Sequence, residues 1–412
     1  MKCRNCQKDL SRVFIDLGSS PPSNSYLDPS DPNAGEVWYP LKVHVCEECF
    51  LVQIDEFKSH SEIFSAEYAY FSSFSKTWLE HAKRYSLSMI ERLRLDRDSF
   101  VVEIASNDGY LLRNFVEAGI PCLGVEPSTN TAEAARLLGV ESWTDFFGND
   151  LARRLVKTRG RADLVVGNNV IAHVPDILDF VDGVKTLLKP DGTATFEFPH
   201  LLNLVKENQF DTIYHEHFSY LSLLSSCKVF EHCGLRIFDA VQLPTHGGSL
   251  RLMVCHADSP RPDHPRLSEI LALERSNGME NLEFYLGFQK KADRIKDGLL
   301  SFLLDARRWD KKVVAYGAAA KGNTILNYAG IKPDLIPYVV DASPHKQGKL
   351  LPGSRIPVVS EERLRETKPD FVLILPWNLT TEISRQLSYI GEWGGRFVTA
   401  IPSLSVFDPE HA

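Results

Sequence analysis

The chain has 412 residues, of which 43% are hydrophobic and 24% are charged, and its formal net charge at pH 7 is −8. This length allows two or three domains, and the acidic balance argues against broad contact with nucleic acid or an anionic membrane surface. The start lacks the apolar run of a signal peptide and no stretch is long and apolar enough to span a membrane, so we expect a cytoplasmic protein. Its eight cysteines are then expected as reduced thiols, metal ligands or core residues.

Two CxxC pairs, Cys3 with Cys6 and Cys46 with Cys49, flank a loop of about forty residues near the start of the chain. Each pair can place two thiolates on one tetrahedral zinc ion, and together they form a closed, structural site. The loop is rich in Pro, Ser, Asn and Asp and buries little apolar surface alone, so a metal would be needed to order it. The sequence therefore predicts a zinc-binding domain over residues 1–65. The alternative is that one or both pairs are unrelated free cysteines.

From residue 99, short apolar runs alternate with segments of helical periodicity. Buried strands are expected at 100–105, 122–127, 162–169 and 193–198. Helices are expected between them at 110–119, 131–139, 150–158 and 177–189. This alternation predicts a parallel sheet with helices on both faces, which binds its ligand at the carboxyl ends of the strands.

The turn that follows the first strand, at Glu103, resembles a nucleotide-binding turn with most of its glycines replaced. Ala105 and Asn107 stand at two glycine positions, and only Gly109 remains. Glu126, at the end of the second strand, is placed to accept both hydroxyls of a ribose, with a helix cap as the alternative. Because the turn lacks a cradle for a diphosphate, we expect S-adenosylmethionine as the cofactor.

Further site candidates follow the later strands. Phe146 could flank the adenine ring, although an aromatic residue at such a position is as often part of the core. Asn168 and Asn169 end the next strand and lead into a loop that lies over the cofactor in an open sheet. His173 belongs to this loop, before a proline, and we predict that it has a role in the site.

The segment 211–220, DTIYHEHFSY, carries more proton-handling groups and aromatic rings than a core strand or a solvated loop needs. A zinc-protease motif is excluded because only one residue separates its histidines. In an extended conformation His215 and His217 would share one face, and Tyr214 and Glu216 the other. Either histidine can act as a general base, because imidazole titrates near neutrality.

A helix at 221–234 and two paired strands at 235–243 and 248–257 are expected next. Their connection, THGGSLR, carries His246 and Arg251, which could face the substrate. The alternative is a glycine turn followed by a solvated arginine.

A domain boundary is predicted near residues 258–265, and two helical segments follow it, the second over 282–308. The segment 312–331 is expected to form a strand, a turn of small residues and a helix whose N-terminus could hold an anion. It has neither a Walker motif nor GxGxxG, which argues against ATP or NAD. The predicted substrate contacts of this part are Lys321, Asn323, Asp341, His345, Lys346, Trp377 and Asn378. A domain without a ligand is the alternative.

Together, these motifs resemble those of the sugar C-methyltransferases, which act on nucleotide-linked 4-keto-6-deoxysugars. The resemblance covers nearly the whole chain and rests on both CxxC pairs, YAYFSSFS, EIASNDG, NNVIAHV, FDTIYHEHFSY, THGGSLR, VVAYGAAAKGNT and VVDASPHKQGKLLPG. It implies an α/β protein with a zinc-binding domain (1–65), a class I methyltransferase domain with a Rossmann-like sheet (66–258) and a Rossmann-like domain for the sugar nucleotide (259–412). It also implies His217 as the base, in a site lined by Tyr68, His173, Tyr214 and Glu216.

The chemistry implied is methylation of carbon, which needs a carbanion equivalent. A 4-keto group acidifies the hydrogen on C3, and a base can remove it to leave an enolate stabilised by nearby donors. We therefore predict an S-adenosylmethionine-dependent C-methyltransferase acting at C3 of a nucleotide-linked 4-keto-deoxysugar, with dTDP as the nucleotide that the resemblance implies and His215 as the competing base. The alternatives are an O- or N-methyltransferase on the same fold and a non-catalytic zinc- and nucleotide-binding module.

Overall fold

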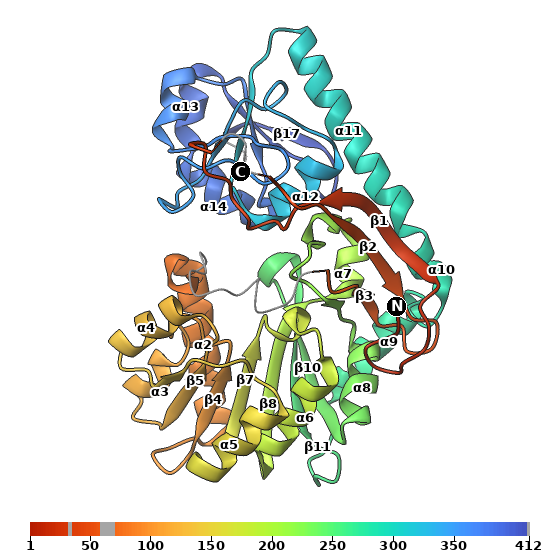
Figure 1. Cartoon of the computed structure of the whole chain (residues 1–412), viewed down its shortest axis with the longest axis vertical. Coiled ribbons are helices and arrows are strands. Elements are labelled where there is room, and N and C mark those ends of the chain that lie inside the picture. The colour runs from red at the N-terminus through yellow and green to blue at the C-terminus, as the bar shows by residue number, and fades with distance from the viewer. Residues whose placement is uncertain (32–34, 58–70, 410–412) are drawn as a thin grey trace.

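The computed structural model describes residues 1–31, 35–57 and 71–409, and these form three sheets surrounded by helices (Figure 1). No helix in these ranges is long and apolar enough to cross a membrane. Tyr68, which the family resemblance assigns to the active site, lies outside the described residues.

The central sheet has seven strands in the order β10-β11-β8-β7-β4-β5-β6. The strands are β4 (Val101–Ile104), β5 (Cys122–Val125), β6 (Ser142–Trp143), β7 (Ala162–Asn168), β8 (Leu188–Pro199), β10 (Leu235–Leu243) and β11 (Ser249–His256). β11 is antiparallel to both of its neighbours, and the other pairings are parallel. This order, with one reversed strand near one edge, is that of the class I methyltransferase fold, so the predicted fold class is confirmed.

Helices cover both faces of this sheet because successive strand residues point to opposite sides. Val102 packs into a core with the helices α5 and α6, whereas its neighbour Val101 packs into a second core with α2 and α3. The helices are α2 (Lys76–Leu93), α3 (Arg113–Glu117), α4 (Thr129–Leu137), α5 (Asn149–Arg159), α6 (Ile177–Leu187), α7 (Leu201–Lys206) and α8 (Leu223–His232).

The N-terminal sheet is a structure that the composition of its loop did not indicate. Its order is β1-β2-β3-β9, with β1 (Arg12–Ser20), β2 (Tyr39–Val45), β3 (Val52–Ile54) and β9 (Ser219–Tyr220). Phe14, Leu41 and Val43 are buried in its core, so the residues between the CxxC pairs do bury apolar surface. The last strand, β9, comes from the segment that directly follows YHEHF.

The C-terminal sheet has the order β14-β13-β12-β15-β16-β17, parallel except for the antiparallel β17. Its strands are β12 (Val313–Tyr316), β13 (Val339–Val340), β14 (Val358–Val359), β15 (Phe371–Ile374), β16 (Arg396–Thr399) and β17 (Ser405–Phe407). The helices of this part are α9 (Pro265–Ser276), α10 (Leu282–Leu286), α11 (Phe288–Arg308), α12 (Ala320–Tyr328), α13 (Glu362–Thr367) and α14 (Thr380–Gln386). The helix expected over 282–308 is therefore wrong as one unit, because it breaks at Gly287 into α10 and α11.

One stretch of the N-terminal part crosses to the C-terminal sheet after β1 ends (Figure 1). Leu27 pairs with Leu350 in an antiparallel bridge, and Asn323 of α12 donates a hydrogen bond to the Ser23 carbonyl at 2.7 Å. One hydrophobic core contains residues of β1, α7, α11 and the C-terminal sheet. The domain limits at residues 65 and 258 stay predictions, and residue 65 lies outside the described residues.

Candidate active site

The four cysteines of the CxxC pairs come together in one cluster. All four Sγ atoms lie within 4.8 Å of one another, with Cys3 and Cys49 3.4 Å apart and Cys6 and Cys46 3.5 Å apart. Four sulfurs bound at about 2.3 Å to a tetrahedral zinc ion would lie about 3.8 Å from each other. The cluster therefore fits a structural zinc ion, and a Cys₄ site leaves no coordination position for a substrate.

The turn predicted to hold S-adenosylmethionine lies at the carboxyl ends of β4 and β5. Ala105, Asn107 and Gly109 all have left-handed backbone, with φ of 55°, 49° and 77°. A Cβ at Gly109 would lie 3.1 Å from the Ala135 and Val140 side chains, so this turn packs tightly against α4 and the loop after it. Gly109 accepts this conformation without strain and Asn107 tolerates it, whereas Ala105 does so only at a cost.

Glu126 connects this turn to the end of β5. One carboxylate oxygen accepts from the Asn107 N–H and the other from the Ser128 N–H, both at 2.9 Å. Burial raises the pKa of Glu126, while these hydrogen bonds lower it. The carboxylate thus does cap the local backbone, as the alternative to ribose binding supposed, and the Thr131 and Ser128 side chains also contact it.

Unpartnered polar atoms collect at the same edge of the sheet. Glu103 Oε2 and both side-chain polar atoms of Asn168 are buried and have no hydrogen-bond partner among the described residues. Burial raises the pKa of Glu103 well above its ordinary value. Buried polar groups in a folded protein are nearly always satisfied, so these atoms fit a polar ligand such as the ribose or amino-acid end of S-adenosylmethionine. Phe146, by contrast, is only half-buried, in the loop after β6.

The YHEH segment forms a turn, so the extended arrangement considered from the sequence is wrong. The His217 N–H donates to the Tyr214 carbonyl at 3.0 Å, with His215 and Glu216 as the central residues. As a result the rings of Tyr214 and His217 lie against one another, with centroids 4.0 Å apart and planes tilted by 34°. His215 is turned away from both of them.

His217 has a defined protonation pattern. Its Nδ1 lies 2.8 Å from the Thr212 carbonyl, which can only accept, so Nδ1 carries the proton and Nε2 has the lone pair. Burial lowers the pKa of His217 well below its ordinary value, and His173 lowers it further. The His173 and His217 rings are 4.6 Å apart at 69°. Burial also lowers the pKa of His173, to about 4. Both imidazoles are therefore neutral at pH 7.

His215 lies in a different environment, against the N-terminal sheet. Its Nε2 is 3.2 Å from the Pro40 carbonyl, and its ring meets those of Tyr39 and Phe57 edge-on at 5.9 Å and 6.4 Å. Burial lowers the pKa of His215 as well. Its contacts are those of a residue that joins the turn to β2.

The N-terminal part contributes a residue that the sequence did not single out. Asn24, in the stretch that crosses to the C-terminal sheet, donates a hydrogen bond to Glu216 Oε1 at 2.7 Å. Tyr26 follows it and donates to the Ala318 carbonyl at 2.5 Å. The signal was weak, because a lone Asn in a loop rich in Pro and Ser is more often a turn residue.

A second cluster joins the same segment to the C-terminal sheet. Trp377 donates from Nε1 to Asp211 Oδ2 at 2.8 Å, and Lys321 lies 4.7 Å from the Trp377 ring and donates to Asn378 Oδ1 at 3.0 Å. Burial raises the pKa of Asp211 to about 6, and Lys321 lowers it. The Lys321 charge also lowers the pKa values of His217 and His246, so these groups share one electrostatic environment.

His246 reaches this cluster from the THGG turn. Its Nε2 lies 3.3 Å from Asn169 Nδ2, and its ring is 5.1 Å from that of Trp78. The structure thus brings His173, Tyr214, His217, His246, Lys321, Trp377 and Asn378 toward one region, between the carboxyl edge of the central sheet and α12.

Other predicted substrate contacts have partners inside the protein. Arg251 donates to the buried carboxylate of Glu197 at 2.8 Å and lies 4.6 Å from the Tyr85 ring, so it is not the solvated arginine of the alternative. Asn323 holds the Ser23 carbonyl. Asp341 accepts from the Ala318 N–H at 2.8 Å and Lys346 donates to the Ala318 carbonyl at 2.9 Å, whereas His345 is exposed.

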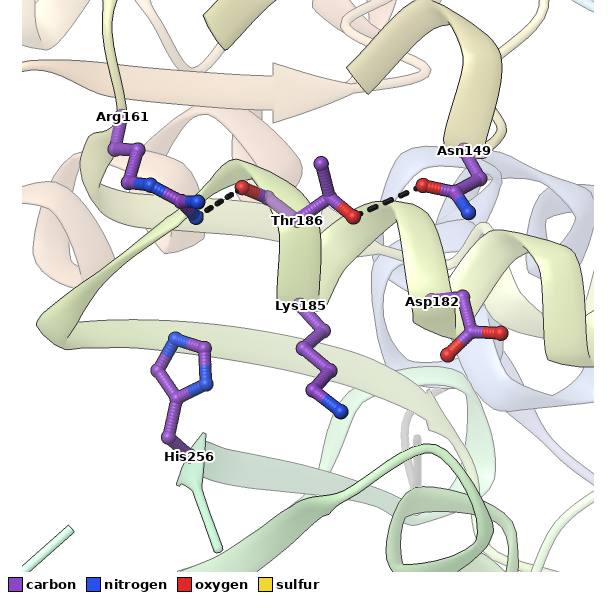
Figure 2. Close-up of a pocket in the computed structure, with 6 residues that line it drawn as sticks. All are labelled: Asn149, Arg161, Asp182, Lys185, Thr186 and His256. Carbon is purple, nitrogen blue, oxygen red and sulfur yellow. Dashed lines mark hydrogen bonds between the residues drawn. The ribbon is translucent and has the colours of Figure 1, made fainter. Parts of the chain in front are cut away.

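A hollow of about 400 Å³ lies elsewhere on the central domain (Figure 2). Arg161 precedes β7, Thr186 and Lys185 precede β8, and His256 ends the antiparallel β11. These positions belong to the amino edge of the parallel strands, opposite to the edge at which Asn168 ends β7. The hollow is therefore separate from the candidate active site.

The chain is similar in sequence to known proteins along nearly its whole length. The chain matches family models described as a zinc binding domain (residues 3–64), a methyltransferase domain (78–240) and a C-methyltransferase C-terminal domain (244–402). It is 36% identical over 409 residues to the C-methyltransferase NovU of Streptomyces niveus, covering 99% of this chain and 97% of that protein. A ubiquinone biosynthesis O-methyltransferase of Rhodopseudomonas palustris (strain TIE-1) is 30% identical over 107 residues, which are 26% of this chain and 40% of that protein. Magnesium protoporphyrin IX methyltransferase from Synechocystis PCC 6803, solved with S-adenosylmethionine, aligns at a TM-score of 0.34 with 13% identity, covering 43% of this chain and 79% of that one.

Proposed function

Because the chain belongs to the C-methyltransferase family that its motifs resemble, we propose that it methylates C3 of a nucleotide-linked 4-keto-deoxysugar through an enolate, with His217 as the base. The family membership makes it an S-adenosylmethionine-dependent enzyme. We propose three further points: the position of methylation, the identity of the sugar nucleotide and the enolate step.

The observation that carries the proposal is the state of the His217 ring. The Thr212 carbonyl keeps the proton on Nδ1, and no described residue occupies Nε2. A neutral imidazole with one fixed N–H and one available lone pair is the form that a general base needs at neutral pH. Nε2 would accept the proton from C3, and the C–H electron pair would move into the C3–C4 bond as negative charge develops on the ketone oxygen.

The surrounding residues support the remaining steps. Tyr214, whose ring centroid lies 4.0 Å from that of His217, is the donor that we propose for the developing oxygen anion. Glu126 and the orphaned atoms of Glu103 and Asn168 would orient the cofactor. Bound S-adenosylmethionine supplies the electrophilic methyl group that the C3 carbon attacks. Lys321, at the N-terminus of α12, is the cation that we propose for the substrate phosphates.

Exchange of the C3 hydrogen with deuterated water tests the base directly, because it needs no methyl transfer. With dTDP-linked 4-keto-deoxysugars as the first substrates, the wild type is expected to exchange the hydrogen and His217→Gln to be slower by a factor of about 10² to 10⁴. His215→Gln is the matched control and should exchange normally, and calorimetry should show unchanged binding of S-adenosylhomocysteine in both variants. Normal exchange by His217→Gln would remove His217 from this role.

A sugar nucleotide whose ketone has been reduced to a hydroxyl tests the reaction type with the same enzyme. A C-methyltransferase of this mechanism should be inactive on it, and mass spectrometry with labelled methyl donor would show no product. Methylation of that substrate would instead indicate an O- or N-methyltransferase.

A further inference from the structure

Arg4 lies inside the first CxxC pair, between Cys3 and Cys6, and its side chain leaves the cysteine cluster. Its Nε donates to the Pro175 carbonyl and its Nη1 to the Ile54 carbonyl, both at 2.8 Å. Two N–H groups of one planar guanidinium thus hold two carbonyls from distant parts of the chain. The flexible point charge of lysine does not reproduce this geometry.

Both carbonyls belong to segments that carry or support the active-site histidines. Pro175 is two residues after His173. Ile54 ends β3, and its N–H donates to the carbonyl of Phe218, the residue after His217, at 3.1 Å. The Arg4 guanidinium carbon also lies 5.5 Å from the Phe218 ring. One side chain therefore contacts the loop of His173 directly and the turn of His217 through Phe218.

The other end of Arg4 is fixed to the cysteine cluster. Its backbone N–H donates at 2.9 Å to the Oε1 of Gln53, which is fully buried on β3, and Gln53 Nε2 lies 3.3 Å from Cys3 Sγ. The CxxC turn from Cys3 to Cys6, which we call the zinc knuckle, is joined by these hydrogen bonds to β3. Cys46 to Cys49 form the second knuckle. Movement at the cysteines would therefore be transmitted to Pro175 and Phe218.

From these contacts we infer that Arg4 is a positioning residue, which sets the placement of His173 relative to His217 from the zinc knuckle. The two rings are only 4.6 Å apart, and a shift of about 1 Å in a reacting group can lower a rate about a hundredfold. The zinc-binding part would then serve the reaction without any contact between the ion and the substrate. The inference rests on the proposed role of His217.

Arg4→Gln and Arg4→Lys test the inference, with Arg12→Gln as the matched control. Arg12 is exposed, lies in the same part of the chain and pairs with Glu47, beside the second knuckle. We expect both Arg4 variants to lose at least tenfold in kcat, with KM for sugar nucleotide and methyl donor within twofold of wild type and one zinc ion retained per chain. Arg12→Gln should match the wild type in all three. A kcat within twofold of wild type for Arg4→Gln would overturn the inference.

A readout independent of turnover is the NMR spectrum of ¹⁵N-labelled imidazoles. Arg4→Gln should shift the signals of His173 and His217, and Arg12→Gln should leave them in place; unshifted signals in Arg4→Gln would count against the inference. If Arg4→Gln lost zinc or did not fold, Phe218→Leu would decide, because it leaves the knuckle intact. We expect at least a threefold loss of kcat there, and an unchanged kcat would overturn the inference.

The two proposals fail in distinguishable ways. If His217→Gln exchanges the C3 hydrogen normally, the proposed base is wrong whatever Arg4 does. If His217 is required and Arg4→Gln behaves as wild type, only the role of Arg4 is wrong.

Discussion

Asp211→Asn should make the protein more stable relative to the wild type as the pH rises. The pKa of Asp211 is about 6 in the folded protein, against 3.8 for an unburied side chain, because burial disfavours the carboxylate. The native state therefore binds this proton more tightly than the unfolded chain does, and that advantage is lost as the pH rises from 3.8 to 6. A difference of about 2.2 units corresponds to about 3 kcal/mol in total, of which about 2 kcal/mol falls between pH 4.5 and pH 7.5.

The asparagine does not titrate, and its Oδ1 can still accept from Trp377 Nε1. The assay is urea unfolding followed by circular dichroism, in both proteins, at pH 4.5 and 7.5. Asp239→Asn is the control, because Arg92 and Arg266 overcome the effect of burial and lower the pKa of Asp239 below its ordinary value. Its linkage therefore lies at more acidic pH, and its difference from wild type should stay nearly constant between pH 4.5 and 7.5. A difference in unfolding free energy between Asp211→Asn and wild type that stayed constant across this range would refute the reasoning.

Three further outcomes are expected. The kcat/KM for methyl transfer should fall only below about pH 6.5, because burial lowers the pKa of His217 and the base is then lost only in acid; a midpoint above pH 7 in a discontinuous product assay would contradict this. Arg251→Met should lower the free energy of unfolding by about 1.5 to 3 kcal/mol, because the buried Glu197 loses its arginine but keeps its contacts with His81 and Thr245; chemical denaturation measures this, and a loss below 1 kcal/mol would indicate a dispensable pair. Gly124→Ala places a Cβ 2.3 Å from Ser106 Oγ, in the turn that is expected to hold S-adenosylmethionine. Calorimetry should show about tenfold weaker binding of S-adenosylmethionine, and the double variant Gly124→Ala with Ser106→Gly should bind it normally.

The central sheet could be predicted because its strands are short, apolar and separated by helices of clear periodicity. The apolar runs at 100–105 and 122–127 became β4 and β5, and the segment 177–189 contains α6. The four cysteines were also predictable, since CxxC pairs have few other uses in such a chain. These are local patterns, and each can be recognised within a window of about twenty residues.

Contacts between distant segments could not be predicted in the same way. β9 is two residues long and pairs with β3, so nothing in its own sequence marks it as a strand. The bond between Asn24 and Glu216 joins positions that no periodicity relates. The conformation of YHEH was misjudged because the bond from the His217 N–H to the Tyr214 carbonyl outweighs the strand tendency of an aromatic segment.

The origin of β9 has a consequence for the order in which the protein is assembled during synthesis. The edge that β3 presents, which ends at Ile54, leaves the ribosome long before its partner at Ser219 and Tyr220 has been translated. The N-terminal sheet therefore cannot be completed until β9, which is synthesised much later, is available. Closing this long loop slows folding relative to a sheet whose strands are neighbours in the sequence. A nascent chain halted before residue 219 would display an open edge suited to chaperone binding or mispairing.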